Sequence, residues 1–92
     1  MSDYITMSID MLRQAFPKPP TNSEYLALMR IMAPHMSQRN LADVLVIFTG
    51  RDDAKVANDV LGIGGMALDE QEVQRVQRLL DGAGFEVWLR DA

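Results

Sequence analysis

Apolar residues recur every three or four positions in four stretches of this chain, and that spacing predicts four amphipathic helices. The stretches comprise residues 8–16, 21–33, 52–62 and 69–81. Thr21 and Glu24 match the capping box, in which each side chain satisfies an otherwise unpaired backbone N–H at a helix start. Asp69 and Glu72 repeat the spacing with an acid as the cap, and Gly82 is well placed to end that helix in a left-handed conformation.

Two other stretches favour strands. Residues 85–90 (FEVWLR) alternate between apolar and polar side chains, as a half-buried strand does. Residues 41–49 (LADVLVIFT) are ambiguous, because helical spacing at the start gives way to a compact β-branched run before Gly50. We expect a helix at the start of this stretch and a strand at its end. Since one strand cannot satisfy its own backbone, residues 44–49 and 4–7 are the candidate partners of 85–90.

The length of 92 residues supports one globular domain, which we expect to cover residues 1–92. The predicted fold class is α+β, with about four helices packed on a small sheet of two or three strands. The alternative is an all-α helical domain with a C-terminal β-hairpin-like strand.

The side chains that catalysis needs are nearly missing from the composition. The chain has no cysteine and a single histidine, His35, which leaves no thiolate nucleophile, no disulfide and no set of zinc ligands. We therefore expect a protein that is not an enzyme, binds no cofactor or metal, and acts by binding. The N-terminal stretch does not resemble a secretory signal, and the longest apolar run, residues 44–48, is far too short to cross a bilayer. These features predict a cytoplasmic protein without a membrane partner.

The net charge of −4 is unevenly distributed. Residues 1–51 carry five basic and four acidic side chains, whereas residues 52–92 carry four basic and nine acidic ones. An acidic surface repels nucleic acid and attracts a basic protein surface. The expected partner is therefore a larger protein or ribonucleoprotein complex with a basic nucleic-acid-binding surface. The acids expected to contact it are Asp52, Asp53, Asp59, Asp69, Glu70 and Glu72.

Two motif interpretations compete with this expectation. Residues 54–62 and 69–81 could form a helix-turn-helix with 85–90 as a wing, although the acids of the second helix would then face DNA phosphates. The sequence GIGGMA at 62–67 is similar to the glycine-rich fingerprint of dinucleotide-binding proteins. However, the preceding stretch contains Asn58 and Asp59 where a buried strand should be apolar.

In its size, its acidity and its lack of cysteine and of an active site, the whole chain resembles the small phage-encoded anti-CRISPR proteins. Many of these block RNA-guided complexes sterically or by imitating nucleic acid. The resemblance has no motif, so it transfers no site residue. It implies that the acids would meet basic surfaces of the target, while Arg30 and Arg39 would touch acidic protein or guide RNA.

Overall fold

Residues 3–91, the part of the chain that the computed structural model describes, form helices joined by short connections, with no strand among them. Two 3-10 turns, Ala33–His35 and Ile63–Gly65, follow the second and the fourth helix. The α-helices of this part are α1 (Tyr4–Ala15), α2 (Asn22–Met32), α3 (Gln38–Thr49), α4 (Asp53–Gly62), α5 (Glu70–Gly82) and α6 (Phe85–Asp91). The expected domain bounds include residues 1, 2 and 92, which lie outside the described residues.

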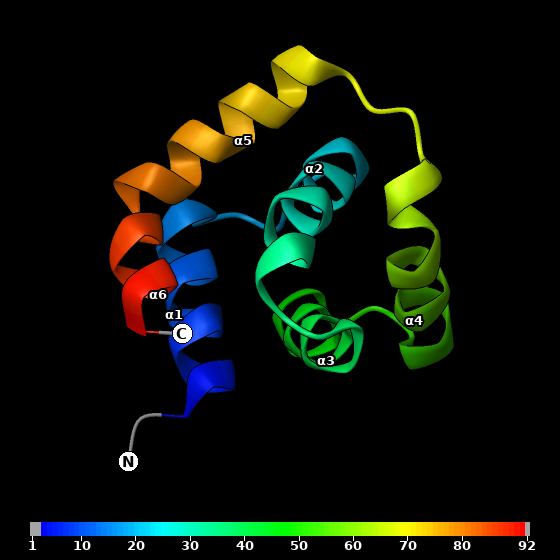
Figure 1. Ribbon diagram of the computed structural model, residues 1–92, viewed down its shortest axis with the longest axis horizontal. Helices are drawn as coiled ribbons and strands as arrows, with labels where there is room; N and C mark the ends of the chain where they lie inside the picture. Colours follow the sequence, from blue (N-terminus) through cyan, green and yellow to red (C-terminus); the bar gives the residue numbers. More distant parts are fainter. Residues whose placement is uncertain (1–2, 92) are drawn as a thin grey trace.

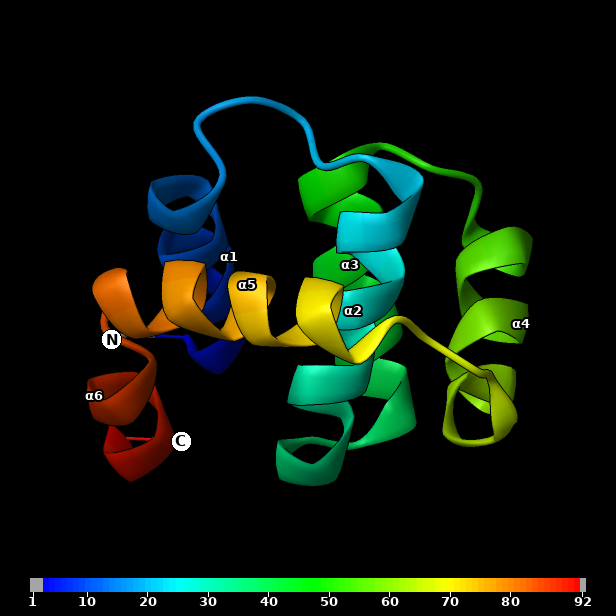
Figure 2. The ribbon, with the colours of Figure 1, turned by 90° about the horizontal axis from the view of Figure 1, so that it is seen from above.

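The first four helices run alternately in opposite directions, and α5 lies across α1 and α2 (Figure 2). Helix α3 packs between α1 and α4, while α5 packs on α2 and also touches α1 (Figure 1). Helix α6 turns back beside α1. The buried apolar side chains form one cluster to which all six α-helices contribute. Its fully buried members include Leu12, Tyr25, Leu28, Met29, Met32, Leu41, Val44, Leu45, Val56, Val76 and Leu80.

The α+β prediction is wrong for residues 41–49, which belong entirely to α3. The Ser37 hydroxyl caps the helix by accepting a hydrogen bond from the Asn40 N–H at 3.1 Å. Gly50 ends the helix in the left-handed region, with φ of 70°. Leu41, Val44 and Leu45 are buried at helical spacing, and this burial outweighs the strand preference of the β-branched run.

The predicted C-terminal strand is also wrong, because residues 85–90 lie in α6. Phe85 and Trp88 are three residues apart and are both buried, whereas Val87 points outward. The indole N–H of Trp88 donates a buried hydrogen bond of 2.8 Å to the Ser8 hydroxyl on α1. Residues 4–7, the other candidate strand, belong to α1. The alternative prediction therefore agrees with the structure in the all-α class and fails at its C-terminal strand, and residues 3–91 form six α-helices where about four were predicted.

The predicted helix ends are confirmed in part, and the first helix begins at Tyr4 instead of at residue 8. Thr21 and Glu24 form the capping box, with hydrogen bonds of 2.8 and 3.2 Å. Asp69 caps α5, but Glu72 binds Arg75 and does not complete a second capping box. The left-handed residue after α5 is Gly84, with φ of 92°, and not Gly82 as predicted.

Candidate interaction surface

The predicted acids on α4 have three different environments. Asp52 caps the helix by accepting a hydrogen bond from the Lys55 N–H at 3.1 Å. Asp59 is mostly buried and accepts hydrogen bonds from the Tyr25 hydroxyl at 2.9 Å and from the Lys55 ammonium at 3.1 Å. Asp53 is exposed in the first turn of α4. Of these three acids, Asp52 and Asp53 at the start of α4 are exposed to a partner.

The predicted acids at the start of α5 each bind another group of the same molecule. Asp69 caps α5, and Glu70 forms an exposed ion pair of 3.0 Å with Arg30. Glu72 pairs with Arg75 at 2.7 Å. Five of the six predicted acids, Asp52, Asp59, Asp69, Glu70 and Glu72, are therefore held by hydrogen bonds or ion pairs within the molecule.

Arg75 links α2 to α5 through two carboxylates. Its guanidinium donates to Glu24 at 2.6 Å and to Glu72 at 2.7 Å. The hydrogen bond from Arg75, together with the Thr21 backbone N–H, lowers the pKa of Glu24 below its usual value. The same two carboxylates raise the pKa of Arg75, so this side chain stays charged. Arg75 therefore connects the start of α2 to the start of α5 at the surface.

A second polar cluster joins α2 to α4 around the buried ring of Tyr25. The guanidinium of Arg51 stacks over this ring, 4.1 Å from its centroid, and donates to the Asn22 side chain at 3.1 Å. Burial, and then the hydrogen bond to Asp59, raise the pKa of the Tyr25 hydroxyl well above its ordinary value. This cluster fixes the position of α4 against the body of the molecule.

On another side of α4, an open groove runs along the surface between it and α3. The groove has a volume of about 660 Å³, and most of its lining is apolar. Ile47 on α3 and Leu61 on α4 line it with exposed fractions of 55% and 68%. Its remaining lining residues are Ile5, Gln38, Arg39, Ala42, Asp43, Val46, Asp53, Ala57 and Val60. We call this surface the α3–α4 groove.

The charged residues of the groove stand on both helices. Arg39 and Asp43 come from α3, one helical turn apart, and Asp53 comes from the first turn of α4. Arg39 and Asp53 are the predicted contact residues that line the groove, whereas Arg30 and Glu70 pair with each other outside it. Asp52, the cap of α4, is the exposed neighbour of Asp53.

The sequence prediction missed Ile47 and Leu61. Ile47 lies two residues after the buried Leu45, so a helix turns it away from the core, but a strand interpretation of the same stretch hides this. Leu61 follows the buried Val60 and likewise lies off the buried side of α4. A helical interpretation of residues 41–49 would have identified Ile47 as an exposed apolar residue, because α3 then has apolar side chains on two sides.

The geometry required by the two motif interpretations is not found in residues 3–91. Helix α4 packs on α3, whereas α5 packs on α2, so these helices are not the packed pair of a helix-turn-helix, and the expected wing is α6. The stretch before Gly62 is helical where the dinucleotide fingerprint needs a strand. Residues 63–65 form a 3-10 turn, without a glycine in the left-handed region.

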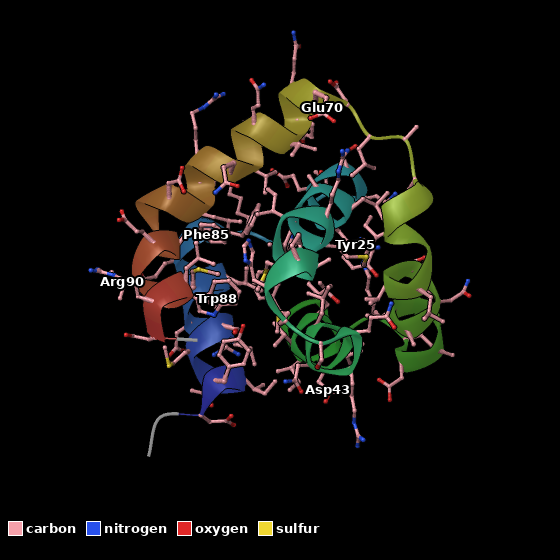
Figure 3. The ribbon with its side chains drawn as sticks, viewed as in Figure 1. Tyr25, Asp43, Glu70, Phe85, Trp88 and Arg90 are labelled. Atoms are coloured by element: carbon pink, nitrogen blue, oxygen red, sulfur yellow. The ribbon has the colours of Figure 1, made fainter. Side chains whose placement is uncertain are left out.

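His35 contributes to an aromatic cluster. Its ring meets the rings of Phe85 and Trp88 edge-on, with centroids 5.9 and 6.3 Å apart, and Tyr4 stacks on Trp88 at 5.6 Å. Phe85 and Trp88 lie between α6 and the body of the molecule (Figure 3). No group of three or more potential metal-ligating side chains occurs among the described residues.

Comparison with protein-family models, with curated proteins and with solved structures gave no significant match. Within residues 3–91, no helix combines the length and the apolar character needed to cross a bilayer.

Proposed function

We propose that this protein is a non-enzymatic binding protein that acts by occupying a surface on a larger assembly, with the α3–α4 groove as its contact. The observation that supports this most is the exposure of Ile47 and Leu61 in one open, mostly apolar groove. Apolar surface gains about 25 cal/mol per Å² when it leaves water, so covering this groove provides a driving force for association. The charged groups at the groove are Arg39, Asp43 and Asp53, with no histidine or hydroxyl nucleophile among its lining residues.

The proposed partner is a protein or ribonucleoprotein complex with a basic nucleic-acid-binding surface. Asp43 and Asp53 at the groove, with Asp52 beside them, would pair with lysine or arginine side chains that otherwise contact phosphates. Arg39 would contact an acidic group of the same complex or its guide RNA. A protein bound in this way would exclude nucleic acid, as many of the phage-encoded anti-CRISPR proteins that the chain resembles do. We place this action in the cytoplasm of the host cell.

The test is affinity capture from cells of the native host, with three forms of the protein compared. The wild type is expected to retain a nucleic-acid-binding complex and to reduce the binding of that complex to its own nucleic acid. A variant with Ile47→Ser and Leu61→Ser should lose both effects, because the apolar contact is removed. A matched control with Val87→Ser and Leu89→Ser removes the exposed apolar side chains of α6 and should retain both effects.

Two outcomes would contradict the proposal. The first is equal retention of the complex by the groove variant and the wild type. The second is retention of a complex whose nucleic-acid binding is unchanged by a saturating amount of the protein. Circular dichroism and thermal unfolding of each variant show whether the fold is intact.

A further inference from the structure

The two ends of the α3–α4 groove carry side chains of opposite charge. Helices α3 and α4 run in opposite directions (Figure 2), so the start of one lies beside the end of the other. One end of the groove therefore carries Arg39, from the start of α3, and Leu61, from the end of α4. The other end carries Ile47 and Asp53. Each end thus holds one charge and one exposed aliphatic side chain, and the two charges have opposite signs.

This arrangement is self-complementary. In a dimer with two-fold symmetry, the same patch of both molecules meets, so each contact of residue i with residue j occurs twice. Two grooves can face each other with the α3 helices of the two molecules running in opposite directions. The Arg39 end of one molecule then lies on the Asp53 end of the other. Each end of the dimer then combines one cation with one anion, and Leu61 of one molecule with Ile47 of the other. Asp43, the third charged residue of the groove, lies on α3 between the two ends, so the two Asp43 carboxylates approach each other near the two-fold axis and weaken the dimer. If the grooves met with their helices aligned in the same direction, like charges would meet at both ends, which is unfavourable.

We propose that a second copy of this chain occupies the groove, in a reversed, two-fold symmetric dimer built from α3 and α4 of both molecules. Four helices packed face to face in this way form a bundle, which is a stable way to bury the apolar sides of helix pairs. The regulatory consequence rests on the function proposed above: the dimer covers the surface that the partner needs, so binding of the partner requires dissociation of the dimer.

The size of the two helices predicts a weak and reversible dimer. Helices of 12 and 10 residues are about 18 and 15 Å long. Stable complexes bury about 800 Å² on each partner, and the whole molecule has 5510 Å² of accessible surface. Two such helices side by side, each about 10 Å wide, cover a footprint of roughly 20 by 18 Å, which is below that area, so we expect a weak dimer with a dissociation constant in the micromolar range.

Sedimentation equilibrium of the purified chain tests the proposal. Between about 5 and about 500 µM, the average mass should rise from that of the monomer toward that of the dimer. Ile47→Glu should weaken the dimer at least about tenfold by placing a charge in the apolar contact. Val87→Glu is the matched control, because Val87 is 50% exposed on α6, away from the groove, and it should leave the dimer unchanged.

A charge exchange tests the reversed orientation. Arg39→Asp alone and Asp53→Arg alone should each weaken the dimer, because each change brings like charges together across the interface. The double variant should restore it, because each molecule then offers an acid at one end and a base at the other.

A monomer at every concentration would overturn the proposal and would leave the function proposed above standing, since capture of a partner is measured separately. A dimer that survives Ile47→Glu would also overturn it. A dimer weakened equally by the single and the double charge variants would contradict the reversed orientation.

Discussion

The hydroxyl of Tyr25 donates a hydrogen bond of 2.9 Å to the carboxylate of Asp59, and this bond joins α2 to α4 across 34 positions of the sequence. Helix α4 forms one wall of the α3–α4 groove, and its main packing partner is α3. The contacts of Asp59 and Arg51 with Tyr25 on α2 therefore help to hold α4 in its position.

Replacement of Tyr25 by phenylalanine should lower the free energy of unfolding by about 1–3 kcal/mol, because Asp59 loses a part-buried donor while the packing of the ring is kept. Chemical denaturation measures this change. Tyr4→Phe is the control: its hydroxyl makes only a weak bond of 3.4 Å to the His35 carbonyl, so its loss should cost less. Equal losses in the two variants would show that the bond to Asp59 does not hold α4 in place.

The burial of Tyr25, together with this bond, makes the stability of the protein decline at alkaline pH. The folded state raises the pKa of Tyr25, and burial also raises that of Tyr4, above the value near 10 of an unfolded chain. Between the unfolded and the folded pKa, the unfolded state has lost the proton that the folded state keeps, so stability declines as the pH rises above about 10. Ultraviolet absorbance of tyrosinate should appear at higher pH in the native protein than in denaturant. Coincident titration curves would contradict the burial of Tyr25.

Glu24 should make the stability of the protein depend on pH in the acid range. Its pKa is lowered in the folded state, so the stability it contributes is present above the ordinary value near 4.5 and is lost as the pH falls through the folded value. Glu24→Gln should flatten this acid decline in thermal unfolding experiments. Glu70→Gln, which removes only an exposed ion pair with Arg30, should have a smaller effect. An unaltered acid decline in Glu24→Gln would rule out this role.

Gly82 and Gly84 should respond in opposite ways to alanine. Gly84 has φ of 92°, where a Cβ is strained, so Gly84→Ala should destabilise the protein by about 1 kcal/mol. Gly82 lies in the last turn of α5 with open space where a Cβ would stand, so Gly82→Ala should be neutral or stabilising by up to about 1 kcal/mol. Thermal unfolding of the two variants decides the question, and destabilisation by Gly82→Ala would place the left-handed residue there.

The sequence predicted the features that depend on neighbouring residues. The capping box of Thr21 and Glu24, and the cap of α5 at Asp69, are local hydrogen-bond patterns, and the structure contains them. The errors arose where a short segment satisfies two periodicities. Residues 85–90 alternate in polarity, but Phe85 and Trp88 also lie three apart, and only the contacts of Trp88 with Ser8 and Tyr4 on α1 select the helix.

The candidate site was predictable only in part, for the same reason. Charge alone drew attention to Arg39 and Asp53, and both line the groove. Charge could not reveal that Asp59 is bound to Tyr25, or that Glu70 is paired with Arg30, because these contacts join distant segments. Ile47 could be recognised as exposed only with the knowledge that residues 41–49 are helical throughout.

Hydrogen–deuterium exchange of the protein, alone and in complex with the assembly that it captures from its host, addresses the role of the α3–α4 groove. If the groove is the binding surface, protection on complex formation will concentrate in residues 38–47 and 53–61, and α6 will exchange as in the free protein. Protection confined to α5 and α6, with residues 38–47 and 53–61 unchanged, would contradict it.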